Sequence, residues 1–114
     1  IYVTDADGQN VRQLTNTRID NWSPEWSPDG RTILFLSVVG NGDPAIFLMN
    51  ADGTGRRQLY NSEDYEWGAA WSTDGRSIVF TRDRDDIGFI YMMSSDGSNV
   101  RLISERASYP AWVP

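Results

Sequence analysis

The sequence predicts an all-β fold, and three observations support that prediction. Short runs rich in Ile, Val, Phe and Tyr, such as TILFLS and SIVFT, are bounded by turn residues, a pattern typical of strands. No window carries the i, i+3, i+4, i+7 apolar stripe of an amphipathic helix. The dipeptide of tight hairpin turns recurs along the chain, at Asp7-Gly8, Asp29-Gly30, Asp52-Gly53, Asp74-Gly75 and Asp96-Gly97.

The chain also repeats itself. IYVTDADGQNVRQLT at 1–15 returns as IFLMNADGTGRRQLY at 46–60 and as IYMMSSDGSNVRLIS at 90–104. WSPDGRTILFLS at 26–37 returns as WSTDGRSIVFTR at 71–82. An interval of about 45 residues suits either helical-pair repeats or four-stranded propeller blades. Strands that are apolar on both sides need cover on both faces, which radially packed blades provide. The sequence therefore predicts a β-propeller fragment.

Each repeat contains four strands, here called a to d. Strand a surrounds the Trp, strand b follows the first Asp-Gly pair, strand c is the IFLM run, and strand d is the RRQL run. The chain then holds strands c and d at 1–15, a full blade at 22–60, a second full blade at 67–104 and strand a of another blade at 108–114. We expect two complete four-stranded antiparallel blades flanked by two partial ones.

The segment NWSPEWSPDG carries the aromatic residues of strand a. Strict alternation along a strand places Trp22, Pro24 and Trp26 on one face, and the same holds for the second copy. A buried Trp removes about 150–250 Å² of surface from water. We therefore expect Trp26 and its counterpart Trp71 to be structural residues that anchor their blades.

Composition excludes several classes of function. The chain has 10 basic and 16 acidic residues and a net charge of −6, which argues against a nucleic-acid-binding surface. Without His or Cys it cannot build a Ser-His-Asp triad, a Cys-His pair, a haem ligand or an ordinary zinc site. No apolar run is close to the length of a membrane-spanning segment, which needs about 18 residues. We expect no cofactor.

Acidic runs offer few candidates for catalysis or metal binding. TDADG begins like a calcium loop but lacks its downstream Glu, so an Asx turn is the simpler interpretation. RDRDDIG at 82–88 offers Asp83, Asp85 and Asp86 to a hard cation, although a solvated turn with local ion pairs is the more ordinary structure. No spacing singles out the carboxylate pair of a glycosidase. We predict a protein that is not an enzyme and holds no metal.

The combination PEWSPDGRTILFLS … IFLMNADGTGRRQL resembles the propeller repeat of TolB-like proteins, which also occurs in propeller domains attached to prolyl-oligopeptidase-type hydrolases. The resemblance covers nearly all 114 residues. The chain departs from the pattern at Thr73, which replaces Pro, and at Val113, which replaces Ser. The resemblance implies a six-bladed, non-catalytic propeller, periplasmic or extracellular, that binds protein partners.

Because strands alternate up and down, the a–b and c–d turns share one rim of the sheets, which we call the turn rim. All the Asp-Gly pairs lie there. The opposite rim, the loop rim, holds the b–c and d–a loops at 15–22, 38–45, 60–67, 82–88 and 104–108. These loops differ in length and charge between copies, as functional loops do. The candidate partner-binding residues are Arg18, Asp20, Trp22, Asp64, Tyr65, Trp67 and Arg106.

Three functions remain open. The first is a binding or scaffold module for a protein partner, acting through the loop rim. The second is the non-catalytic propeller portion of a larger hydrolase. The third is a structural subunit that contacts copies of itself head to tail through IYVT and PAW, giving a ring or a filament, because its terminal strands leave open sheet edges.

Overall fold

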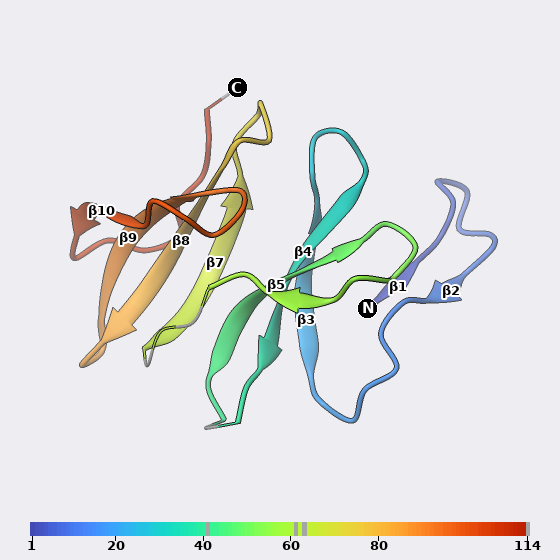
Figure 1. Cartoon of the computed structure of the whole chain (residues 1–114), viewed down its shortest axis with the longest axis horizontal. Coiled ribbons are helices and arrows are strands. Elements are labelled where there is room, and N and C mark those ends of the chain that lie inside the picture. Colours follow the sequence, from blue (N-terminus) through green and yellow to red (C-terminus); the bar gives the residue numbers. More distant parts are fainter. Residues whose placement is uncertain (41, 61, 63, 114) are drawn as a thin grey trace.

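The structure, a computed structural model, describes residues 1–40, 42–60, 62 and 64–113. Within these ranges the chain forms ten strands in three antiparallel sheets (Figure 1). The described residues include no helix long and apolar enough to cross a membrane. The all-β prediction and the expected propeller-fragment architecture are confirmed.

The smallest sheet, blade 1, pairs β1 (Tyr2–Val3) with β2 (Arg12–Gln13). The two larger sheets are each hydrogen-bonded in chain order, as successive strands of a propeller blade are. Blade 2 consists of β3 (Asn21–Trp26), β4 (Thr32–Val38), β5 (Pro44–Asn50) and β6 (Arg57–Gln58). Blade 3 consists of β7 (Tyr65–Trp71), β8 (Ser77–Arg84), β9 (Ile87–Ser94) and β10 (Arg101–Glu105).

The core lies between the blades, which stand side by side in Figure 1. Strand β4 is buried on both sides of its pleat, because one face meets blade 1 and the other meets blade 3. Leu34 and Leu36 join the cluster shared with Trp71 of blade 3. On the other face, Phe35 belongs to a smaller cluster against which Leu14 packs. Because burying apolar surface stabilises a fold by about 25 cal/mol for each Å², these inter-blade contacts contribute to the stability of the chain.

The expectation that Trp22 and Trp26 share a face was wrong. The pairing between β3 and β4 slips by one residue between Trp22 and Glu25, and Ser23 within the slip has a φ of 51°. An extra residue of this kind is a β-bulge, which shifts the alternation and sends the two indoles to opposite faces. Gly68 makes the same bulge in β7, with a φ of 59°.

The two structural tryptophans therefore differ in burial. Trp71 is 8% exposed and sits in the main inter-blade cluster, as expected for an anchor. Trp26 is 46% exposed. It faces the side of blade 1, whose two short strands do not cover it as blade 2 covers Trp71. The anchor role thus holds for Trp71 and only in part for Trp26.

The Asp-Gly turns are Asx turns. Asp7 Oδ1 accepts the backbone N–H of Gln9 at 3.0 Å, which supports the turn interpretation of TDADG over the calcium loop. The same contact to the residue two positions later recurs at Asp29, Asp52, Asp74 and Asp96. Hydrogen bonds from neighbouring Ser or Thr hydroxyls hold the pKa of these four carboxyls below the ordinary value. Each carboxylate is thus used by its own turn.

The strand expected at 108–114 is not formed in the described part of that segment, and Pro114 lies outside the described residues. Strands β3 and β7 are each paired with the b strand of their own blade, whereas the described residues place no b strand beside this segment. Its polar groups bond to blade 3 instead. The N–H of Tyr109 donates to Thr81 Oγ1 at 3.3 Å, and Trp112 donates its indole N–H to a β7 carbonyl at 3.3 Å.

Candidate partner-binding site on the loop rim

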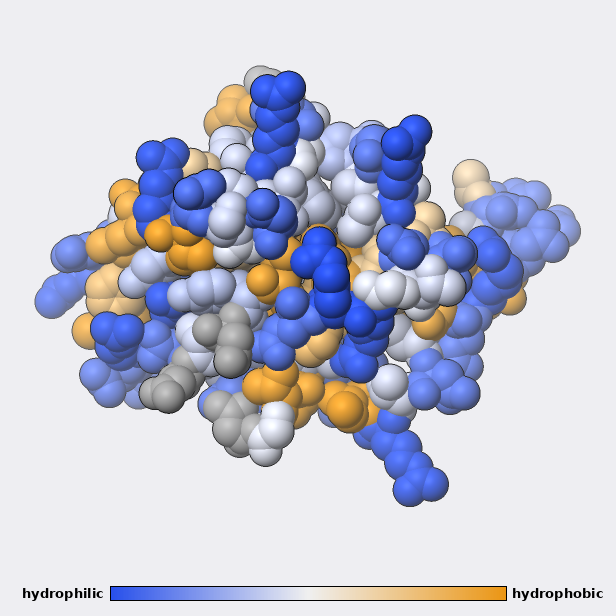
Figure 2. All heavy atoms as spheres, viewed as in Figure 1, coloured by the Kyte–Doolittle hydropathy of each residue, from blue (hydrophilic) through white to orange (hydrophobic). Residues whose placement is uncertain are grey.

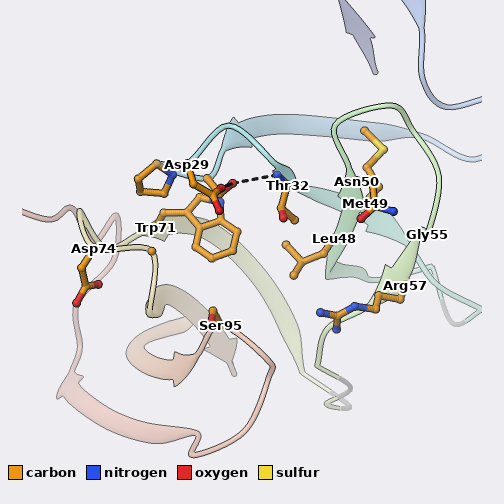
Figure 3. A pocket seen from close by; sticks show the side chains of 13 residues that line it. Asp29, Thr32, Leu48, Met49, Asn50, Gly55, Arg57, Trp71, Asp74 and Ser95 are labelled. Carbon is orange, nitrogen blue, oxygen red and sulfur yellow. Dashed lines mark hydrogen bonds between the residues drawn. The ribbon is translucent and has the colours of Figure 1, made fainter.

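Blades 2 and 3 line a cleft at both the turn rim and the loop rim. The cleft at the turn rim has a volume of about 500 Å³ and is shown in Figure 3, where Trp71 and Leu48 lie between the turns of the two blades. Its acidic side chains, Asp29 and Asp74, accept hydrogen bonds from their own turns. The dashed line in Figure 3 marks a further bond within the turn, in which the N–H of Thr32 donates to Ser27 Oγ at 3.0 Å. The polar groups of this cleft therefore serve mainly the fold.

The cleft at the loop rim has a volume of about 420 Å³ and a different lining. We call it the aromatic pocket, and it is lined by Trp22, Ser23, Leu36, Tyr65, Trp67, Gly68, Asp83 and Tyr109. A second hollow of about 470 Å³ adjoins it, because Tyr65 and Asp83 line both. The rim therefore passes from an aromatic surface to an acidic one.

Trp67 of this pocket is oriented by its neighbours, and two tyrosines of the pocket are exposed. The indole N–H of Trp67 donates to Asp83 Oδ2 at 2.8 Å, which sets the orientation of the ring. The ring of Tyr109 meets Trp67 edge to face, with centroids 4.4 Å apart. Tyr65 and Tyr109 are 45% and 78% exposed. The pocket is thus held in shape while its aromatic surface stays open to a partner.

The acidic side of the rim is a tight hairpin. Strand β8 runs through Arg84 and β9 starts at Ile87, so the predicted loop at 82–88 shrinks to two turn residues. Asp85 and Asp86 have φ values of 53° and 61°, the left-handed pair of a type I′ turn. Among the residues that the structure describes, no group of three or more acidic side chains could hold a metal ion.

A charged pair is buried beneath the rim. Glu66 of β7 is 1% exposed, and its Oε1 accepts a hydrogen bond from the Ser62 hydroxyl at 2.7 Å. Arg82 Nη2 lies 3.9 Å from the same oxygen, and Arg82 Nε lies 3.8 Å from Asp64. Burial raises the pKa of the Glu66 carboxyl above its ordinary value, while the bond from Ser62 and the charge of Arg82 oppose the rise. Glu66 and Arg82 therefore form a buried ion pair beneath the loop rim, with Asp64 as a partly buried neighbour.

The structure brings three of the sequence-predicted site residues together. Trp22, Tyr65 and Trp67 all line the aromatic pocket, although they come from two blades. Sequence analysis missed Tyr109 as a site residue and considered Asp83 only as a metal ligand. The Trp-Pro signature at the chain's end could have suggested an aromatic neighbour, whereas no sequence signal links Asp83 to Trp67.

The other four predicted residues lie apart from the pocket. Asp64 forms an ion pair with Arg84 at 2.9 Å. Arg106 lines a separate hollow of about 350 Å³ beside the start of β9. Arg18 and Asp20 are exposed in the loop before β3 and line none of these hollows. Part of the 60–67 loop, Asn61 and Glu63, lies outside the described residues.

A family model for the TolB beta propeller domain matches residues 1–114. The chain belongs to the TolB beta propeller domain family. A curated sequence relative, the Tol-Pal system protein TolB of Alcanivorax borkumensis, is 41% identical over 44 residues, which cover 39% of this chain and 10% of that protein. The TolB-like resemblance of the repeat is thereby confirmed.

Solved TolB structures share the fold. The putative TolB from Agrobacterium tumefaciens matches with a TM-score of 0.83 and 26% identity, over 97% of this chain and 45% of that one. TolB from Acinetobacter baumannii matches with a TM-score of 0.79 and 25% identity, over 90% of this chain and 26% of that one. This chain therefore spans less than half the length of each TolB relative.

Proposed function

We propose that this chain is a non-enzymatic protein-binding module of the TolB family, which acts through the loop rim. The observation that carries the proposal is the aromatic pocket, where Trp22 of blade 2, Tyr65 of blade 3 and Tyr109 of the C-terminal segment surround one hollow, with Tyr65 and Tyr109 exposed. Tyr and Trp are enriched in protein–protein interfaces, because their rings bury large areas at low cost in conformational entropy. The turn rim supports this choice by contrast, since the acidic side chains of its cleft, Asp29 and Asp74, accept hydrogen bonds within their own turns.

Membership of the family supports a setting for this activity. A sequence relative is named as a protein of a Tol-Pal system. We infer that the partner is a protein of such a system and that the chain works in the periplasm or outside the cell. The lack of His and Cys supports a role without catalysis, because the usual nucleophile–base pairs need one of them.

The proposal is tested by measuring the affinity of the chain for purified proteins of a Tol-Pal system. Replacing both Tyr65 and Tyr109 by Ala should weaken binding about tenfold or more, since truncating central interface aromatics typically costs over 1 kcal/mol each. Tyr2→Ala is the matched control, because Tyr2 is 65% exposed on blade 1. Equal affinities of the double variant and the control would contradict the proposal.

A second candidate function, self-assembly, is favoured by apolar residues at the two ends of the row of blades. Tyr2 of blade 1 is 65% exposed at one end, while Leu102 and Ile103 of β10 in blade 3 are 44% and 51% exposed at the other end. Hydrophobic atoms are visible at that end of the molecule in Figure 2, on the left. Head-to-tail contact would cover both surfaces and give a ring or a filament. Sedimentation velocity at several concentrations tests this second function. It is contradicted if the chain sediments as a monomer at every concentration and Ile103→Lys leaves that behaviour unchanged.

A further inference from the structure

We propose that the aromatic pocket binds the guanidinium group of an arginine side chain presented by the partner protein. This inference rests on the proposed function, because it assigns a ligand to the same rim. It adds a chemical class that neither the fold nor the family supplies. Three features of the described residues support it: the arrangement of rings, the charge of the lining, and the use of the same contact elsewhere in the molecule.

The rings come from three separate segments of the chain. Trp22 lies in β3, Tyr65 and Trp67 lie in β7, and Tyr109 lies in the C-terminal segment. A cation is attracted to the face of an aromatic ring, most strongly to that of Trp, when it lies within about 6 Å of the centroid. Several rings around one hollow of about 420 Å³ can surround a planar cation of guanidinium size.

The charge of the lining is negative. Asp83 reaches the pocket and shares one oxygen with the indole of Trp67, while an ionised carboxylate has acceptor sites for further donors. Asp85 and Asp86 line the adjoining hollow. No basic residue is among the described residues that line either hollow. The nearby Arg84 is paired with Asp64 at 2.9 Å. The site therefore offers a negative field without a cation of its own.

The protein uses the contact we propose at two other places. The guanidinium of Arg56 lies 4.6 Å from the ring centroid of Phe47. The guanidinium of Arg82 lies 4.2 Å from the centroid of Tyr91 and 5.0 Å from that of Tyr60. A planar guanidinium stacks on rings and forks toward a carboxylate better than the compact ammonium of Lys does. This preference favours arginine over lysine as the ligand.

The test uses the whole chain and two blocked tripeptides, acetyl-Gly-Arg-Gly-amide and acetyl-Gly-citrulline-Gly-amide. Citrulline has nearly the shape of arginine without its charge. Binding is followed by NMR through the indole N–H signals, with the Trp67 signal assigned from its loss in Trp67→Phe. We expect the arginine peptide to shift the Trp67 signal with an affinity at least about fivefold above that of the citrulline peptide, since charged groups strengthen such contacts.

Asp83→Asn should remove that preference, because it keeps an acceptor for Trp67 but loses the charge. Asp7→Asn is the control, since it makes the same change of charge in an exposed turn on the opposite rim. Equal binding of the two peptides by the unaltered chain, or no binding of either, overturns the inference, and neither result depends on the folding of a variant. If Tyr65 and Tyr109 prove necessary for the protein partner while the peptides bind equally, the proposed function stands and the arginine assignment falls.

Discussion

The backbone N–H of Trp71 in blade 3 donates a hydrogen bond of 3.1 Å to Glu25 Oε1 in blade 2. The bond joins the two a strands and so supplements the apolar packing between the blades. Burial raises the pKa of the Glu25 carboxyl, and the bond from Trp71 opposes that rise. An acidic side chain near the end of strand a therefore serves as a polar link between neighbouring sheets.

Removing that link should destabilise the chain. Glu25→Ala leaves the N–H of Trp71 without its acceptor, and an unsatisfied buried donor costs about 1–3 kcal/mol. Glu25→Gln keeps an oxygen at the same reach and should cost less than half as much. Urea denaturation of the three proteins measures the difference. Identical midpoints for the Ala and Gln variants would show that the bond does not contribute.

The two repeat-equivalent tryptophans should respond unequally to truncation. Trp71→Ala opens a cavity in the inter-blade cluster, which for a buried aromatic costs about 3–5 kcal/mol. Trp26→Ala should cost clearly less, because that side chain is 46% exposed, against 8% for Trp71. Thermal unfolding followed by circular dichroism compares the two, and a larger loss at Trp26 would contradict the described packing.

The c–d turn glycines should differ in the same way. Gly8 and Gly97 have φ values of 80° and 88°, so an alanine at either position is strained by about 1–2 kcal/mol. A Cβ at Gly97 would also lie 2.3 Å from the Leu59 carbonyl oxygen, whereas at Gly8 nothing lies within 4 Å. Gly97→Ala should therefore cost about 1–3 kcal/mol more than Gly8→Ala. Chemical denaturation of both variants gives the comparison, and equal costs would mean that the turn does not press on blade 2.

The stability of the chain should fall with rising pH because of Glu66. Its pKa is raised above 4.5 in the folded state, so the folded chain holds this proton more tightly than the unfolded chain does. The resulting stabilisation is complete below pH about 4.5 and is lost as the pH rises through the folded-state pKa. Glu66→Gln should flatten this part of the melting-temperature profile, and the exposed Glu105→Gln should not. A profile that both variants leave unchanged would contradict the assignment.

Most of the fold could be predicted from the repeat. Strand identities, blade order and the shared rim of the Asp-Gly turns all follow from period and turn chemistry, which are local properties. The bulge at Ser23 could not be predicted in this way, because alternation assumes an unbroken ladder. The same limit applied at 108–113, where a strand-like sequence has no partner strand among the described residues and bonds instead to groups such as Thr81.

The site was less accessible to sequence reasoning. Variation between loops pointed to Tyr65 and Trp67, which do line the aromatic pocket. The same variation between loops also pointed to Asp64 and Arg106, because a charged residue in a loop does not reveal which group its side chain will pair with. Asp83 became a site residue only through its bond to the Trp67 indole. That bond joins residues on neighbouring strands that are 16 positions apart in the sequence.

Blades 2 and 3 place a guanidinium against equivalent aromatic pairs, but from different strands. In blade 3 Arg82 comes from strand b. In blade 2 that position is Ser37, whose hydroxyl accepts a hydrogen bond of 2.6 Å from Arg56 near strand d. The repeats are therefore not interchangeable cassettes. Grafting strand b of blade 3 into blade 2 would place two guanidinium groups against one aromatic pair. The reverse graft would leave the aromatic pair of blade 3 without a guanidinium. Engineering of propellers with this repeat must therefore exchange strands b and d together.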